Sequence, residues 1–172
     1  NQRVNGLPLL TEAFKYFTGQ PSVLGLSPTL VYIFWKSNSA LDNGDLQISF
    51  TPASYKEGLQ SQLDDFPGAT VAPWVQRPES IGHIRAKSAD PFEAPAIQPN
   101  YFSHETDRRL SIAGMKLARD LMQTPEFSPH VECEELPGKD VHTEDEMLAY
   151  YRQNATTTFH LMGTCRMGPD SD

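Results

Sequence analysis

A histidine near the end of the chain, His160, is the residue whose surroundings best suit the transfer of a proton. It stands among Phe159, Leu161 and Met162, and a turn at residues 163–165 follows directly. Imidazole is the side chain best able to move a proton near neutral pH. We expect the apolar neighbours to exclude water from the ring and to hold it still.

Two glycines follow this histidine, Gly163 and Gly168. A residue without a Cβ atom can take a positive φ, and its backbone can approach a flat partner closely. The segment is therefore expected to place a base against a large ligand.

Three other interpretations of these residues stay open. On the residues alone a buried structural histidine is favoured, because single core histidines are commoner than catalytic ones. Cys165 could act as a nucleophile with His160 as its base, but five residues of irregular chain are no defined spacing and no third group orients the pair. Cys133 and His142 could complete a zinc site, but no C-x-x-C or H-x-x-x-H pair anchors one, so no metal is expected.

The chain of 172 residues carries 14 Lys and Arg against 22 Asp and Glu, a net charge of −8. Phosphate contacts need a basic face, so nucleic acid is a poor partner. The two cysteines form no spaced disulfide framework, which fits a cytosolic enzyme. The apolar stretch 22–35 contains Pro28 and falls short of the roughly 20 residues of a membrane-spanning helix. We expect a cytoplasmic protein, with association to a membrane left open.

The first 35 residues are expected to form a helix and a buried apolar segment. In residues 8–19, Leu10, Phe14 and Phe17 recur at helical spacing, and Gly19 is placed to end the helix. Residues 23–35 are mostly apolar, with Ser27, Pro28 and Thr29 between two apolar runs, and are interpreted as core packing.

Three strands are predicted, at residues 45–54, 69–77 and 81–88. In the first, Leu46, Ile48 and Phe50 alternate with polar residues, which indicates a half-buried strand. Pro73 makes the second an edge strand or a bulge. Because the three are close in sequence, we expect one antiparallel sheet with a solvated face. His83 stands in a row with basic residues on the third strand and is expected to be solvated rather than catalytic.

Two helices are predicted in the second half, after a proline-containing connector at 90–100. The longer one has Ser103 or Thr106 as its cap and stops at Pro125, and its apolar stripe is Leu110, Ala113, Gly114, Leu117, Ala118 and Leu121. The shorter one starts with a capping box of Thr143 and Glu146. It is expected to bury Met147, Leu148 and Tyr151. The fold class is therefore α+β, an antiparallel sheet with packed helices.

Several segments, in one order along the chain, resemble the glucose-methanol-choline (GMC) family of flavin oxidoreductases. Residues 157–168, with the pattern H-x-x-G-T-C-R-M-G, resemble the histidine segment near the C-terminus of that family. The other similar segments are residues 45–52, a strand of the substrate domain; 77–85 and 88–101, a strand and loop; and 107–109, a helix start. The chain looks most similar to choline-dehydrogenase-like bacterial members.

The resemblance implies an FAD-dependent enzyme that oxidises a primary alcohol of the choline class to the aldehyde. His160 would be the family's active-site histidine, which takes the hydroxyl proton while a hydride goes to the flavin. Residues 1–158 would belong to the substrate-binding domain, and 159–172 would start the return to the FAD-binding domain. The chain lacks a G-x-G-x-x-G motif, so we expect a C-terminal piece of a two-domain flavoenzyme whose FAD-binding half precedes Asn1.

Two further functions remain as alternatives on the same resemblance. One is a hydroxynitrile lyase, which would use the histidine without net redox chemistry. The other is a non-catalytic binding domain. Substrate contacts would come from the predicted sheet, where alternation makes Gln47, Phe50 and Trp74 candidates, and the cofactor-binding residues stay unidentified. The isolated chain is expected to expose the apolar surface meant for the other half.

Overall fold

The structure is a computed structural model that describes residues 6–27, 29–56, 62–164 and 167–169. It contains three helices, α1 (Gly6–Phe17), α2 (Glu105–Met122) and α3 (Glu144–Asn154), and two short 3-10 turns, η1 (Val23–Gly25) and η2 (Ser128–His130). Its strands are β1 (Val31–Trp35), β2 (Leu46–Thr51), β3 (Thr70–Val75), β4 (His83–Arg85) and β5 (Ala96–Gln98). All pairings are antiparallel, so the α+β prediction is confirmed.

The main sheet has the strand order β1-β2-β3, with β2 in the middle. The alternation predicted for β2 is confirmed, because Leu46 and Ile48 are the two most deeply buried large side chains. β1 comes from the stretch that was interpreted as buried core, and this interpretation is wrong. Four of its five residues are exposed, because β1 is an edge strand of this sheet and α2 packs on β3 and β2.

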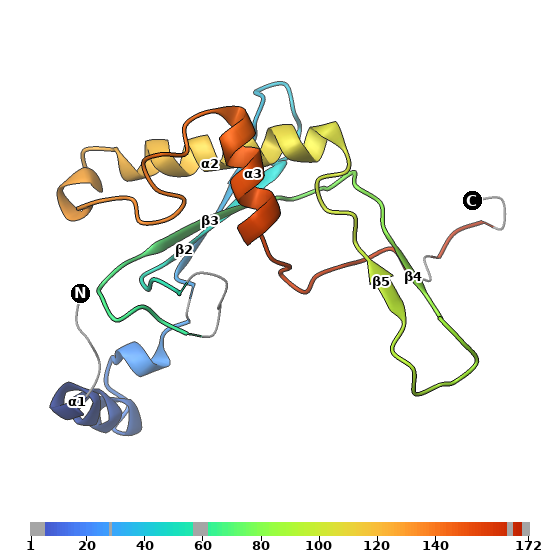
Figure 1. Cartoon of the computed structure of the whole chain (residues 1–172). Coiled ribbons are helices and arrows are strands. Elements are labelled where there is room, and N and C mark those ends of the chain that lie inside the picture. The colour runs from blue at the N-terminus through green and yellow to red at the C-terminus, as the bar shows by residue number, and fades with distance from the viewer. Residues whose placement is uncertain (1–5, 28, 57–61, 165–166, 170–172) are drawn as a thin grey trace.

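Helix α2 packs between the sheet and α3 (Figure 1). A Cβ atom at Gly114 would lie 2.9 Å from Cβ of Pro73, so the missing side chain lets the helix approach β3 closely. On another side of α2, Ile112 and Met115 form a buried cluster with Met147 of α3. The predicted stripe of α2 is therefore core, and the helix is covered on two sides.

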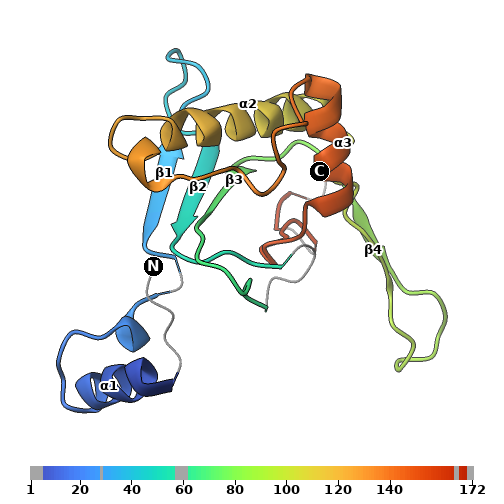
Figure 2. The ribbon, with the colours of Figure 1, turned by 60° about the vertical axis from the view of Figure 1, so that its left-hand side comes forward.

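The strand predicted at 81–88 does not join the main sheet. Its central part is β4, which pairs with β5 in a separate two-stranded sheet, and β5 lies in the segment expected to be a plain connector. The outer side of β3 is a poor template for another strand, because Pro73 has no N–H to donate. Residues 82–99 instead form an arm that projects from the body in both views (Figures 1 and 2).

The base of this arm is fixed to the first turn of α2 by a buried carboxylate. Asp107 is only 4 % exposed, and its two oxygens accept hydrogen bonds from the backbone N–H groups of Glu79 and Ser80, both at 2.8 Å. The hydroxyl oxygen of Ser80 in turn accepts a hydrogen bond from the backbone N–H of His104 at 3.1 Å. The chain entering β4 is thus held to the helix that follows β5.

The caps of the two long helices follow the sequence only in part. α2 begins after His104, whose Nδ1 accepts from the backbone N–H of Thr106 at 3.3 Å, so neither predicted cap residue is the N-cap. For α3 the capping box of Thr143 and Glu146 is confirmed. The backbone N–H groups of Thr143 and His142 both donate to the Glu146 carboxylate and lower its pKa.

Helix α1 lies apart from the sheet in both views, and η1 is its main contact among the described helices and strands (Figures 1 and 2). The predicted helix and its end at Gly19, where φ is +73°, are confirmed. Its apolar stripe is exposed, however, and Phe17 reaches 85 %. The contact with η1 centres on Glu12, which accepts from Lys15 Nζ at 2.6 Å and from the backbone N–H of Val23 at 3.0 Å.

Acid is expected to release α1 from η1. The hydrogen bond from Lys15 and the backbone N–H of Val23 lower the pKa of Glu12 from its ordinary 4.5 to about 2. Because the folded pKa lies below the unfolded one, this stabilisation is complete above about pH 4.5 and is lost as the pH falls towards 2. NMR shifts of the α1 amides and Cα atoms, followed through an acid titration, would report the release.

The matched controls for this titration are two glutamate-to-glutamine variants. Glu12→Gln should remove the pH dependence of the α1 contact, whereas Glu144→Gln, which breaks an exposed ion pair with Lys116, should keep it. An α1 that is released over the same pH range in Glu12→Gln would contradict the assignment.

None of the helices in the described part of the chain combines the length and the apolar character that crossing a membrane requires.

Candidate functional site

His160 lies in the irregular segment that follows α3, and its side chain is exposed. Its apolar neighbours are exposed as well, with Phe159 at 79 % and Met162 at 92 %. The expected water-excluding frame around the imidazole is therefore not formed by the described residues. Apolar side chains in an extended segment shield a ring only when another surface packs over them, and the described part of this chain packs none there.

The backbone around His160 is nevertheless held in an unusual conformation. Phe159 has φ of +60°, which is rare for a bulky residue, and its N–H donates to the hydroxyl of Thr157 at 3.0 Å. Gly163 has φ of +100°, as expected for a glycine in this bend, and the space where a Cβ would point is empty within 4 Å. The segment thus presents the histidine between two left-handed turns, with an unobstructed backbone behind it.

The other candidates from the sequence do not gather around His160. His83 is exposed on β4, as expected, and Cys133 is an exposed free thiol. The described residues contain no group of three or more His, Cys, Asp or Glu side chains that could hold a metal ion. Cys165, the nucleophile of the alternative interpretation, lies outside the described residues.

Two of the three candidate substrate contacts lie side by side on the sheet. Gln47 of β2 and Trp74 of β3 are direct cross-strand partners and share the face turned away from α2. Phe50 points to the other face, where its ring lies 5.8 Å from the ring of Phe127, so it is a packing residue. The strand register therefore leaves Gln47 and Trp74 as candidate substrate contacts, whereas Phe50 is no longer one.

Sequence reasoning missed two aromatic residues on this face. Tyr32 and Phe34 of β1 pair with Ser49 and Gln47 of β2, which places them beside Trp74. The stretch 31–35 is apolar at every position, so no alternation marked which side chains share a face. We call the face formed by Tyr32, Phe34, Gln47, Ser49, Ala72 and Trp74 the open face.

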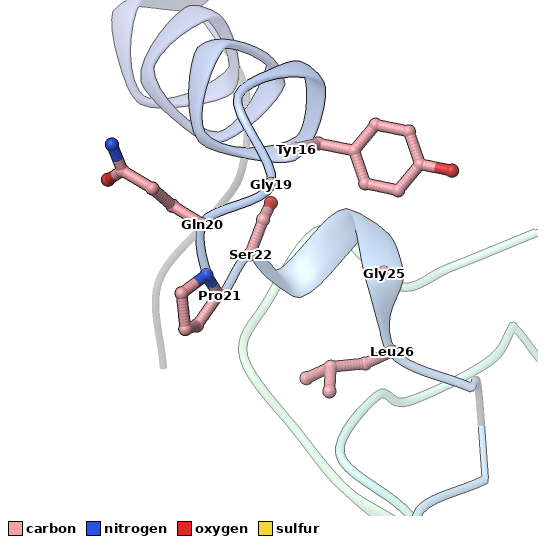
Figure 3. A pocket seen from close by; sticks show the side chains of 7 residues that line it. All are labelled: Tyr16, Gly19, Gln20, Pro21, Ser22, Gly25 and Leu26. Atoms are coloured by element: carbon pink, nitrogen blue, oxygen red, sulfur yellow. The ribbon is translucent and has the colours of Figure 1, made fainter.

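A shallow hollow of about 460 Å³ lies elsewhere, between the end of α1 and η1 (Figure 3). It is lined by Tyr16, Gly19, Gln20, Pro21, Ser22, Gly25 and Leu26. Gln20 and Pro21 point away from the ring of Tyr16 (Figure 3). None of these described lining residues is an acid or a histidine, and the hydroxyl of Ser22 donates to the backbone carbonyl of Glu12 at 2.9 Å. It contains neither His160 nor the open face, so it is not the candidate site.

Comparison with known proteins gives a family for this arrangement. The family model described as GMC oxidoreductase matches residues 78–172, which include the arm, α2, α3 and the His160 segment. The chain belongs to the GMC oxidoreductase family. The family resemblance noted in the sequence is thereby confirmed.

Among the relatives of this GMC chain, an "Alcohol dehydrogenase [acceptor]" from Pseudomonas putida is 37% identical over 80% of the chain and 25% of the relative. An oxygen-dependent choline dehydrogenase from Staphylococcus xylosus is 32% identical over 81% of the chain and 25% of the relative. The fold is similar to that of pyridoxine 4-oxidase from Mesorbium loti, with a TM-score of 0.71 at 22% identity over 81% of the chain and 28% of that protein. The GMC chain thus spans about a quarter of the length of these curated relatives.

GMC oxidoreductases are in general flavin-dependent enzymes, and the described residues of this chain fit a flavin in part. The exposed apolar side chains around His160 and the bare backbone at Gly163 suit a large flat ring system. The sequence contains no G-x-G-x-x-G turn that could cradle the diphosphate of a dinucleotide. The fit is therefore to the ring and not to the phosphates.

Proposed function

We propose that this chain is the substrate-binding part of a longer FAD-dependent GMC enzyme that oxidises a primary alcohol to the aldehyde. Residues 1–158 would form part of the substrate domain, and 159–172 would start the return to an FAD-binding domain supplied by the rest of the same protein. The match to the family over residues 78–172 carries the proposal, because it includes the segment around His160. The relatives named for alcohol and for choline both support a primary alcohol as substrate.

In this proposal His160 is the base that takes the hydroxyl proton of the substrate. A neutral imidazole can accept a proton on the nitrogen that carries none, and it does so efficiently near neutral pH. The left-handed backbone at Phe159 sets the direction in which the ring leaves the chain. When bound, FAD supplies the acceptor for the hydride that leaves the carbon of the alcohol.

The proposal accounts for the exposure of His160 in this chain. The apolar side chains of Phe159, Leu161 and Met162 would be covered by the flavin ring and by the FAD-binding domain. That covering would exclude water from the imidazole, which strengthens its interactions with the substrate. The same logic explains why a segment with so much apolar surface faces outward here.

The whole natural protein provides the test. Purified without oxygen, it should show a flavin spectrum that bleaches when a primary alcohol is added, with one aldehyde formed per flavin reduced. A hydroxynitrile lyase would instead release an aldehyde and cyanide from a cyanohydrin and leave the flavin oxidised. A protein that carries no flavin, or whose flavin no primary alcohol reduces, would contradict the proposal.

The cytoplasm is the proposed compartment. Cys133 is free and exposed, as expected in a reducing environment. Separating soluble and membrane fractions of the natural host, with the protein detected by antibody, would test this directly.

The hydroxyl of Thr157 is expected to position the catalytic histidine. It accepts the hydrogen bond that helps to keep Phe159 at positive φ, so Thr157→Val should let the backbone relax and move the imidazole. We expect the limiting rate constant of flavin reduction to fall by about tenfold, with the apparent Kd of the substrate nearly unchanged. A small displacement of a base slows proton transfer and leaves substrate binding largely intact. Stopped-flow reduction without oxygen would measure both parameters.

Thr157→Ser is the matched control, because it keeps the hydroxyl and should restore most of the rate. If Thr157→Val reduces its flavin as fast as the unmodified enzyme, the hydroxyl does not position the histidine.

A further inference from the structure

The open face carries two aromatic rings that meet above the middle strand. The rings of Tyr32 on β1 and Trp74 on β3 lie 6.4 Å apart with an angle of 79° between their planes, although β2 separates the two strands. Phe34 stands beside them and is 63 % exposed. α2 and α3 lie on the opposite side of the sheet (Figure 1). The face therefore offers apolar ring surface that no described helix covers.

Two polar side chains, those of Ser49 and Gln47, lie under and beside these rings. Ser49 is 8 % exposed, and its hydroxyl forms no hydrogen bond with the described residues. The side-chain amide of Gln47 likewise has no partner among the described residues. In contrast, the neighbouring Thr51 hydroxyl is paired with Thr29 at 3.2 Å. No buried side-chain nitrogen or oxygen atom among the described residues lacks a hydrogen-bond partner, so neither Ser49 nor Gln47 is an orphaned buried group. They place a hydroxyl and an amide on the open face, where they can bind a ligand that carries a hydroxyl or carbonyl group.

The open face has no charged residue among its six members. The acid nearest in sequence, Asp45, is not a member of this face, and its two oxygens accept hydrogen bonds from the N–H and hydroxyl of Ser37 at 2.7 and 2.5 Å. The first charged residue after β1 is a cation, Lys36. A positively charged ligand would therefore lose its water on this face without gaining an opposite charge from the six residues that form it.

The ring arrangement also differs from a cage for a quaternary ammonium group. Such cages turn several ring faces towards one cation. Here Tyr32 and Trp74 meet edge to face, so one of the two rings has a face occupied by the edge of the other. The pair suits the flat or branched apolar body of a neutral molecule.

We propose that the open face forms one wall of the substrate-binding site. This wall determines specificity, because it favours uncharged primary alcohols with an apolar body over choline. Tyr32, Phe34 and Trp74 contact the apolar body, and Gln47 and Ser49 bind the oxygen or a second polar group of the substrate. The inference rests on the proposed function, because the rest of the enzyme must close over this face to make a site.

Choline and its neutral carbon isostere, 3,3-dimethylbutan-1-ol, differ in charge but hardly in shape, so they make the decisive comparison. With the whole natural enzyme we expect kcat/KM for the neutral alcohol to exceed that for choline by about tenfold or more, since an unpaired charge is costly to bury. Equal values, or a preference for choline, would overturn the inference. Such a result would leave the proposed function intact, because both compounds are primary alcohols.

Two tryptophan variants locate the selecting surface. Trp74→Ala should lower kcat/KM for 3,3-dimethylbutan-1-ol by about tenfold while hardly changing that for ethanol, which has too little apolar body to contact the ring. Trp35→Ala is the matched control, because Trp35 is half exposed on the same sheet but pairs with Leu46, on the other face. Equal losses in the two variants would overturn the assignment to the open face.

A binding measurement separates this wall from the chemistry. Titration calorimetry with 3,3-dimethylbutanamide, which is neutral and has no hydroxyl to oxidise, should give a Kd that rises by about tenfold in Trp74→Ala and is unchanged in Trp35→Ala. Because no hydride or proton is transferred in this experiment, it tests the open face even in an enzyme without activity. A Kd that Trp74→Ala leaves unchanged would contradict the proposed wall.

Discussion

His160→Ala is expected to slow the reduction of the flavin by a primary alcohol by about 10²–10⁴-fold, the usual contribution of a general base. The substrate would still bind, because the open face lies on the sheet and not on the His160 segment, so KM should change little. Stopped-flow bleaching of the flavin without oxygen measures this step without interference from reoxidation. Residues 143–172 contain no histidine other than His160.

His83→Ala is the matched control for this variant. It removes an imidazole that is also exposed and that lies in the part of the chain matched by the GMC family model. Its rate of flavin reduction should equal that of the unmodified enzyme. If His160→Ala reduces its flavin at the unmodified rate, His160 is not the base, and the substrate hydroxyl loses its proton to another group.

The elements whose apolar residues recur at a regular spacing could be predicted from the sequence. In β2 polar and apolar residues alternate, and in α2 the stripe from Leu110 to Leu121 recurs at helical spacing, so both were placed within a few residues. The capping box of α3 is a local pattern of two side chains and two backbone groups, which needs no tertiary information. These elements show in the sequence because their own residues determine them.

The elements that the sequence did not reveal depend on partners distant in the chain. β1 is apolar at every position, so only its pairing with β2 shows that Tyr32 and Phe34 share a face with Trp74. β5 has only three residues between Pro95 and Pro99, which resembles an extended connector until its pairing with β4 is seen. In the same way the sequence identified Gln47 and Trp74 of the open face, but it did not show that these two residues are direct cross-strand partners.

The candidate base shows the opposite case, in which the sequence favoured an arrangement that the chain does not build. Apolar residues next to His160 were expected to enclose the imidazole, yet they are exposed. Hydrophobicity predicts that a surface will be covered, but it does not say which part of a protein covers it. The frame is therefore best interpreted as one half of an interface with the FAD-binding domain of the proposed enzyme.

Asp107→Ala is expected to destabilise the protein by about 3–6 kcal/mol, because hydrogen bonds to a charged group contribute about 1.5–3 kcal/mol each and two are lost. The backbone N–H groups of Glu79 and Ser80 would be left without their acceptor beneath the arm. Water cannot replace the carboxylate easily, since the residue is 4 % exposed. Denaturant unfolding of the natural protein, and amide hydrogen exchange at residues 79–80 and in β4, would measure the loss.

Glu105→Ala separates this anchoring from a general effect of charge on the helix. Glu105 is an exposed acid in the same first turn of α2, so its removal costs the same interaction with the positive end of the helix, typically about 0.3–1 kcal/mol. Asp107→Asn keeps one acceptor oxygen and should fall between the two variants. If Asp107→Ala and Glu105→Ala lose the same stability, the two backbone hydrogen bonds do not anchor the arm. A larger loss in Asp107→Ala, with faster exchange confined to the arm and its base, would show that α2 holds β4 and β5 in place through this one carboxylate.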